Sequence, residues 1–134
     1  MNIRSAVAAY SIIIGIMMAA MWSVFALTDQ IPELESSPLE ISFHLAAELT
    51  TAFALLLGGV AITMRRHWGY QANMVALGML SYTVIVSPGY YAESGELAFV
   101  AMFGVLMILT LAFIVISIVK KDDIRTEKPD TVDP

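Results

Sequence analysis

The chain has 134 residues, of which 58% are hydrophobic and 14% charged, with a formal net charge of −5 and no cysteine. Soluble domains carry about one quarter charged residues, so this composition excludes an ordinary soluble fold. The lack of cysteine excludes disulfides, thiolate nucleophiles and cysteine metal sites, and no basic patch indicates a nucleic-acid partner.

Two apolar segments are predicted to be transmembrane helices. The first is "SAVAAYSIIIGIMMAAMWSVFAL" (residues 5–27) and the second is "LAFVAMFGVLMILTLAFIVISIV" (residues 97–119); neither contains a charge. About 20 apolar residues span a bilayer core of about 30 Å. Val24-Phe25-Ala26 would suit a signal peptidase, but the first segment is longer than the usual apolar core of a signal peptide, about 7–15 residues. We expect it to remain as a membrane anchor.

Two weaker segments lie between them. Residues 40–64 are interrupted by ionisable side chains, and residues 70–87 end at Ser87-Pro88-Gly89, where proline is expected to break the helix. Counting both as spans predicts an all-α membrane protein, a bundle of four transmembrane helices within a single domain over residues 1–119. The charged residues 120–134 are predicted to form a disordered cytoplasmic tail.

The positive charges indicate the orientation. Residues near the cytoplasmic ends of membrane helices are enriched in Lys and Arg. All such residues near the span ends fall on one side of the predicted bundle: Arg4, Arg65, Arg66, Lys120 and Lys121. Both termini are therefore expected in the cytoplasm (N-in, C-in), in a multi-pass protein of the cell membrane.

Small side chains form a stripe on each of the first two predicted helices. Helices in membranes approach closely where their residues are small. The two stripes consist of Ser11, Gly15, Ala19 and Ser23, then Ala47, Thr51, Ala54, Gly58 and Ala61. We expect the first two helices to pack together through these stripes.

Two ionisable residues, His44 and Glu48, interrupt the second predicted span. At about 100° per residue they share one helix face with Thr51 and are expected to point into the bundle. Counting back from the cytoplasmic end places His44 at the outer interface and Glu48 about 5 Å deeper. The same count brings Trp22 to the level of Glu48, and Tyr90 and Tyr91 could fold over the site. The candidates for a substrate-binding or proton-linked site are Glu48, His44, Tyr90 and Trp22.

The function expected first is structural. His44 and Glu48 are four residues apart on one helix and could pair with each other, which would only fix helix packing. The chain would then be an accessory or packing protein whose partners are the lipid bilayer and a second copy or another membrane subunit. An enzyme is not expected, because the sequence contains no Ser/His/Asp arrangement, glycine-rich phosphate loop or HExxH motif.

Two alternatives remain open. A carboxylate in apolar surroundings favours its neutral form, so Glu48 with His44 could serve a proton- or cation-linked transporter of small molecules. An outward-facing metal site is the second alternative, since Glu40, His44 and Glu48 recur every four residues. These three residues are weak candidates for metal ligands, because a tight zinc site is not expected with only one histidine. No cofactor is predicted.

Overall fold

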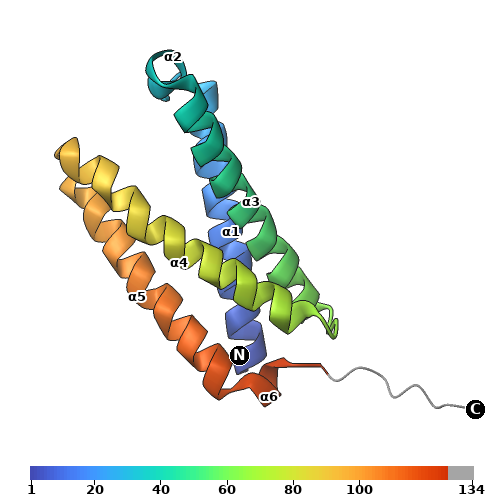
Figure 1. Ribbon diagram of the computed structural model, residues 1–134. Helices are drawn as coiled ribbons and strands as arrows, with labels where there is room; N and C mark the ends of the chain where they lie inside the picture. The colour runs from blue at the N-terminus through green and yellow to red at the C-terminus, as the bar shows by residue number, and fades with distance from the viewer. Residues whose placement is uncertain (127–134) are drawn as a thin grey trace, which may run out of the picture.

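The computed structural model describes residues 1–126, and all regular structure in these residues is helical. The helices are α1 (Ile3–Leu27), α2 (Glu33–Ser36), α3 (Pro38–Thr63), α4 (Gly69–Glu93), α5 (Leu97–Val119) and α6 (Lys121–Ile124) (Figure 1). α1, α3, α4 and α5 are each long and apolar enough to cross a membrane. The predicted all-α fold with four such helices is therefore confirmed.

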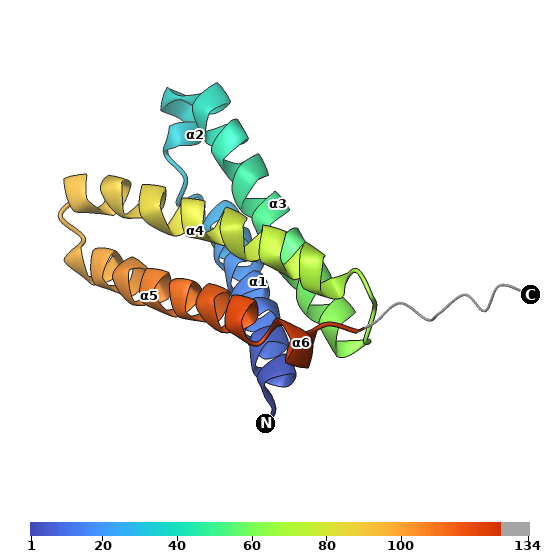
Figure 2. The same cartoon turned by 60° about the horizontal axis from the view of Figure 1, so that its bottom comes forward.

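The long helices form two antiparallel pairs. α1 packs along α3, α4 packs on α3, and α5 packs along α4. Figures 1 and 2 show that the α1–α3 pair and the α4–α5 pair diverge toward the end that carries α2 and the α4–α5 connection. The bundle is thus closed around the N-terminus and α6 and splayed at the other end.

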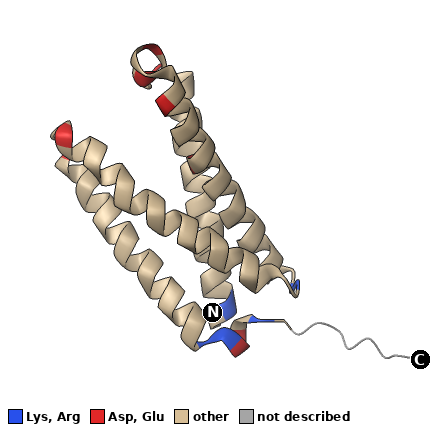
Figure 3. Ribbon diagram, viewed as in Figure 1, with Lys and Arg blue, Asp and Glu red and all other residues tan. Residues whose placement is uncertain are grey.

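Charge is divided between the two ends of the bundle. Figure 3 shows Lys and Arg at the end with the N-terminus, the α3–α4 connection and α6, which we call the basic end. Asp and Glu gather at the opposite end, which we call the acidic end, although α6 also carries Asp122 and Asp123. The polarity inferred from the sequence is therefore present in the folded chain.

The contact between α1 and α3 depends on glycine. A Cβ atom at Gly15 would lie 2.9 Å from the carbonyl oxygen of Ala52, and one at Gly59 would lie 2.9 Å from that of Ala8. Ser11, one turn before Gly15, is fully buried. Gly15 of the stripe predicted on the first helix thus packs on α3 as expected, whereas Ser23 at the end of this stripe is exposed.

Two members of the stripe predicted on the second helix, Gly58 and Ala61, contact α4. A Cβ atom at Gly58 would lie 2.7 Å from the Cα atom of Asn73 in α4, and one at Gly69 would lie 2.8 Å from the backbone of Ala61. Consecutive helix residues point about 100° apart, so Gly58 faces α4 while Gly59 faces α1. The expectation that Gly58 packs against the first helix is wrong, because its position faces Asn73 of α4.

The third long helix does not break at Pro88. α4 continues through this proline to Glu93, beyond the predicted end at residue 87. The ring of Tyr91 stacks on Phe99 and Phe103 of α5, with centroid distances of 4.7 and 5.7 Å. These stacked rings hold the last turns of α4 against α5, which offsets the backbone hydrogen bond that proline removes.

A hydrogen bond joins α1 to α5 near the middle of the bundle. The hydroxyls of Tyr10 and Thr110 lie 2.7 Å apart, and the Tyr10 ring stacks on Phe113 with a centroid distance of 4.3 Å. Thr110 is fully buried. This contact connects the two helix pairs on the basic-end side of their divergence.

The beginning of the predicted disordered tail is folded. Residues Lys121–Ile124 form α6, and the Ile124 side chain packs against Val7 and Ile62 at the base of the α1–α3 pair. Arg4 donates to the backbone carbonyl of Arg125 at 3.1 Å. The prediction of disorder is wrong for this segment, and residues 127–134 lie outside the described part of the chain.

Candidate functional site

Glu48 lies between α1 and α3 in their acidic half. Its side chain is 5% exposed, and the indole N–H of Trp22 in α1 donates to its Oε2 atom at 3.4 Å. Hydrogen bonds from N–H groups to carboxylates are usually near 2.7–2.9 Å, so this one is long. Thr51, one turn further along α3, donates its own hydroxyl to the Ala47 carbonyl. Glu48 therefore has one weak donor within residues 1–126.

His44 lies beside this pair without joining it. The imidazole is half-buried and meets the Trp22 ring edge to face, at a centroid distance of 5.7 Å. His44 is close enough to act on Glu48 electrostatically, yet within residues 1–126 no Lys, Arg or His forms an ion pair with Glu48. The structure therefore brings Trp22, His44 and Glu48 together, but the His44–Glu48 ion pair considered from the sequence is not formed.

The buried-side tyrosine near the end of α4 is Tyr91, which stacks on Phe99 and Phe103 of α5. Its half-buried side chain packs against the apolar core and lies within electrostatic range of Glu48. Tyr90, the residue selected from the sequence, is half-exposed, and its hydroxyl faces Glu33 of α2. Tyr91 continues the buried face of α4 that contains Leu77 and Val84 at seven-residue intervals, a signal that sequence reasoning lost by ending the helix at Pro88.

Glu40, His44 and Glu48 do not form a metal site. Within residues 1–126 no group of three or more His, Asp or Glu side chains is placed to hold an ion. Glu40 is exposed near the start of α3, whereas Glu48 is buried against Trp22. Residues eight apart on a helix, such as Glu40 and Glu48, are separated by about 12 Å along its axis, too far for one ion to bind both.

The arrangement is suited to reversible binding of a proton or a cation. A buried carboxylate is stabilised by hydrogen bonds or by positive charge, and Glu48 has one long hydrogen bond and no ion pair within the described residues. Trp22 beside it is half-buried, as is His44 one helical turn nearer the acidic end. Protonation or a bound cation would supply the missing stabilisation.

Comparison with known proteins assigns the chain to a family. The family described as "Domain of unknown function (DUF8058)" matches residues 1–129, which include all four long helices. No curated protein and no solved structure matches the chain. The chain belongs to the DUF8058 family.

Proposed function

We propose that this chain is an integral membrane protein that crosses the cell membrane four times with both termini in the cytoplasm. The length and apolar composition of α1, α3, α4 and α5 support four crossings. The gathering of Lys and Arg at one end of the bundle supports a cytoplasmic location for that end (Figure 3). Glu48 then lies in the outer half of the membrane.

The proposed activity is proton- or cation-linked transport of a small molecule through Glu48. The observation that carries this proposal is that the buried carboxylate has a single, long hydrogen bond and no ion pair within residues 1–126. A purely structural glutamate would be expected to pair with His44, four residues away. Ionisable groups inside membranes are unfavourable for stability and are usually functional, so the unpaired carboxylate favours transport over packing.

His44 has a place in this proposal as a proton relay. Its half-buried ring lies on the acidic-end side of Glu48 and contacts Trp22. An imidazole ring can accept a proton on one nitrogen and donate a proton from the other. A proton from the outer medium would reach His44 first and then pass, through water, to Glu48.

The test is whether Glu48 exchanges a proton. Infrared difference spectra of the purified protein between acidic and alkaline buffer should contain the C=O band of a buried protonated carboxyl group. This band should be absent from Glu48→Gln and unchanged in Glu40→Gln, whose carboxylate lies on the same helix but is exposed. A band that persists in Glu48→Gln would refute the proposal.

A second candidate function, the accessory or packing protein, is favoured by the exposure of α5. This helix is the most apolar of the four long helices, yet its buried residues are only Phe103, Thr110 and Ser117. Its free face could pack against a second copy or another membrane subunit. Light scattering of the protein in detergent measures whether it forms a dimer, and a strictly monomeric protein would argue against self-association.

A further inference from the structure

Aromatic rings from both helix pairs lie around the acidic half of the bundle. On the α1–α3 pair, Trp22 contacts both Phe25 and His44 edge to face, at centroid distances of 5.9 and 5.7 Å. On the α4–α5 pair, Tyr91 stacks on Phe99 and Phe103. Glu48 lies against the first group and within electrostatic range of Tyr91 in the second. The carboxylate thus contacts the first aromatic group, and the second aromatic group lies on the neighbouring helix pair.

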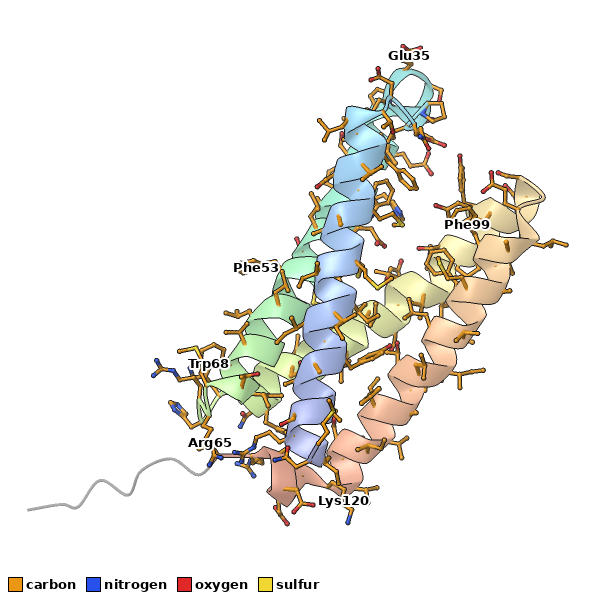
Figure 4. The ribbon with its side chains drawn as sticks, turned by 180° about the vertical axis from the view of Figure 1, so that it is seen from behind. Glu35, Phe53, Arg65, Trp68, Phe99 and Lys120 are labelled. Atoms are coloured by element: carbon orange, nitrogen blue, oxygen red, sulfur yellow. The ribbon has the colours of Figure 1, made fainter. Side chains whose placement is uncertain are left out.

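The charged side chains at the acidic end, near Glu48, are all negative. The acidic residues of this end are Asp29, Glu33, Glu35, Glu40, Glu93 and Glu96, and residues 5–64 and 67–119 contain no Lys or Arg. Figure 4 shows Glu35 at the tip of the α1–α3 pair and Phe99 near the same end of the α4–α5 pair. Clustered charge of one sign raises the local concentration of the opposite ion. The acidic end therefore attracts cations toward the diverging helix pairs.

We infer that Glu48 and the aromatic side chains of Trp22 and Tyr91 bind an organic ammonium ion with an apolar body, which enters from the acidic end between the two helix pairs. This inference rests on the proposed cation-linked function of Glu48 and names its substrate class.

The chemistry of the site favours an organic cation over a metal ion. Aromatic faces attract ammonium groups within about 6 Å of the ring centre, and this attraction grows when water is excluded. Hard metal ions instead require several oxygen ligands, and residues 1–126 contain no cluster of acidic and histidine side chains that could provide them. The apolar part of the ligand would contact the rings while Glu48 neutralises its charge.

Access to the carboxylate requires a movement of Trp22. Glu48 is almost fully buried, but the Trp22 side chain that covers it is half-buried and held by a hydrogen bond of 3.4 Å. A rotation of the indole would release this weak bond and expose both Glu48 and the ring face. The cation would then replace the indole N–H as the partner of the carboxylate.

The experiment is a binding titration of the full-length protein in detergent with benzyltrimethylammonium. Saturable binding is expected, and it should be weakened about tenfold or more by Glu48→Gln and by Tyr91→Leu. The matched controls are Glu40→Gln and Tyr82→Leu, since Glu40 and Tyr82 are exposed residues of the same helices, and both variants should bind as the wild type does. Neopentylbenzene, the uncharged isostere of the probe, should not compete.

Several outcomes would overturn the inference. Equal competition by neopentylbenzene would mean that only apolar surface is recognised, and unchanged binding by Glu48→Gln would place the cation elsewhere. If Tyr91→Leu unfolds, Trp22→Leu takes its place as the aromatic variant and should also bind about tenfold more weakly. A Glu48 carboxyl band in the infrared spectra without saturable binding would contradict this inference and leave proton-linked function standing. Absence of that band from the wild-type spectra would contradict proton exchange at Glu48, whereas saturable binding that still depends on Glu48 would leave this inference standing.

Discussion

The indole N–H of Trp22 donates to the carboxylate of Glu48 at 3.4 Å and so links α1 to α3 in the acidic half of the bundle. No ion pair accompanies this hydrogen bond within residues 1–126. A structural ion pair and a functional carboxylate predict opposite responses when the charge is removed. Stability measurements on this residue pair can therefore separate the two interpretations.

Glu48→Gln should not lower stability. Glutamine keeps the size of the side chain and can still accept from Trp22, but it removes a buried charge that has one weak partner. We expect the melting temperature to stay the same or to rise by a few degrees, equivalent to about 1–2 kcal/mol. Thermal unfolding in detergent measures this, with Glu40→Gln as the exposed control. A fall of several degrees in Glu48→Gln alone would restore the packing interpretation.

Trp22→Phe should lower stability, because it removes the indole N–H and leaves Glu48 buried without its donor. The expected loss is about 1–3 kcal/mol, the range for an unsatisfied buried polar group. Trp68→Phe provides the control at an exposed indole in the α3–α4 connection. In a double-mutant cycle, the Trp22→Phe effect should shrink when Glu48 is already Gln. Strictly additive effects would show that the hydrogen bond contributes little.

Gly58→Ala should separate α3 from α4. The added methyl group would lie 2.7 Å from the Cα atom of Asn73, a backbone atom that cannot move aside independently. Overpacking of this kind lowers stability by about 1–3 kcal/mol. Gly78→Ala is the matched control in α4, because a Cβ atom there meets nothing within 4 Å, and alanine should stabilise the helix by up to about 1 kcal/mol. Equal melting temperatures for the two variants would contradict the close α3–α4 contact.

A structural feature could be predicted from the sequence when the residues that determine it are close together in the chain. The bounds of α1 and α5 follow from uninterrupted apolar segments, and the depth count placed Trp22 level with Glu48, where the structure puts them in contact. The end of α4 could not be predicted locally, because the stacking of Tyr91 on α5 outweighs the effect of Pro88. A helix that ends at Pro88 gives no buried face by which to distinguish Tyr90 from Tyr91, so both tyrosines could be expected over the site and the candidate selected was Tyr90.

The folded start of the C-terminal segment escaped prediction for a related reason. The sequence "KKDDI" resembles a solvated tail, and its one apolar residue is buried only because the packed bases of α1 and α3 provide a surface for it. Local composition contains no information about that surface. The same applies to Asn73, whose burial depends on the close approach permitted by Gly58.

Ile124→Ala should destabilise the basic end of the bundle. Ile124 is 2% exposed and contacts Val7 and Ile62, so its truncation leaves a cavity. The expected loss is about 2 kcal/mol, at the lower end for buried isoleucine because this site lies near the surface. Val119→Ala is the control, since Val119 is 71% exposed. The measurement is chemical denaturation of both variants in detergent. Equal denaturation midpoints would mean that packing of α6 on the bundle does not contribute to stability.

The topology can be measured directly because the chain contains no cysteine. Ser36→Cys and Ser94→Cys place single thiols at the acidic end, and His67→Cys places one at the basic end, all at exposed positions. If the basic end faces the cytoplasm, a membrane-impermeant maleimide added to intact cells should label the first two variants and not the third. Permeabilised cells should be labelled in all three, which controls for thiol reactivity. Labelling of His67→Cys alone in intact cells would show that the orientation is the opposite of the expected one. Glu48 would then lie in the cytoplasmic half of the membrane.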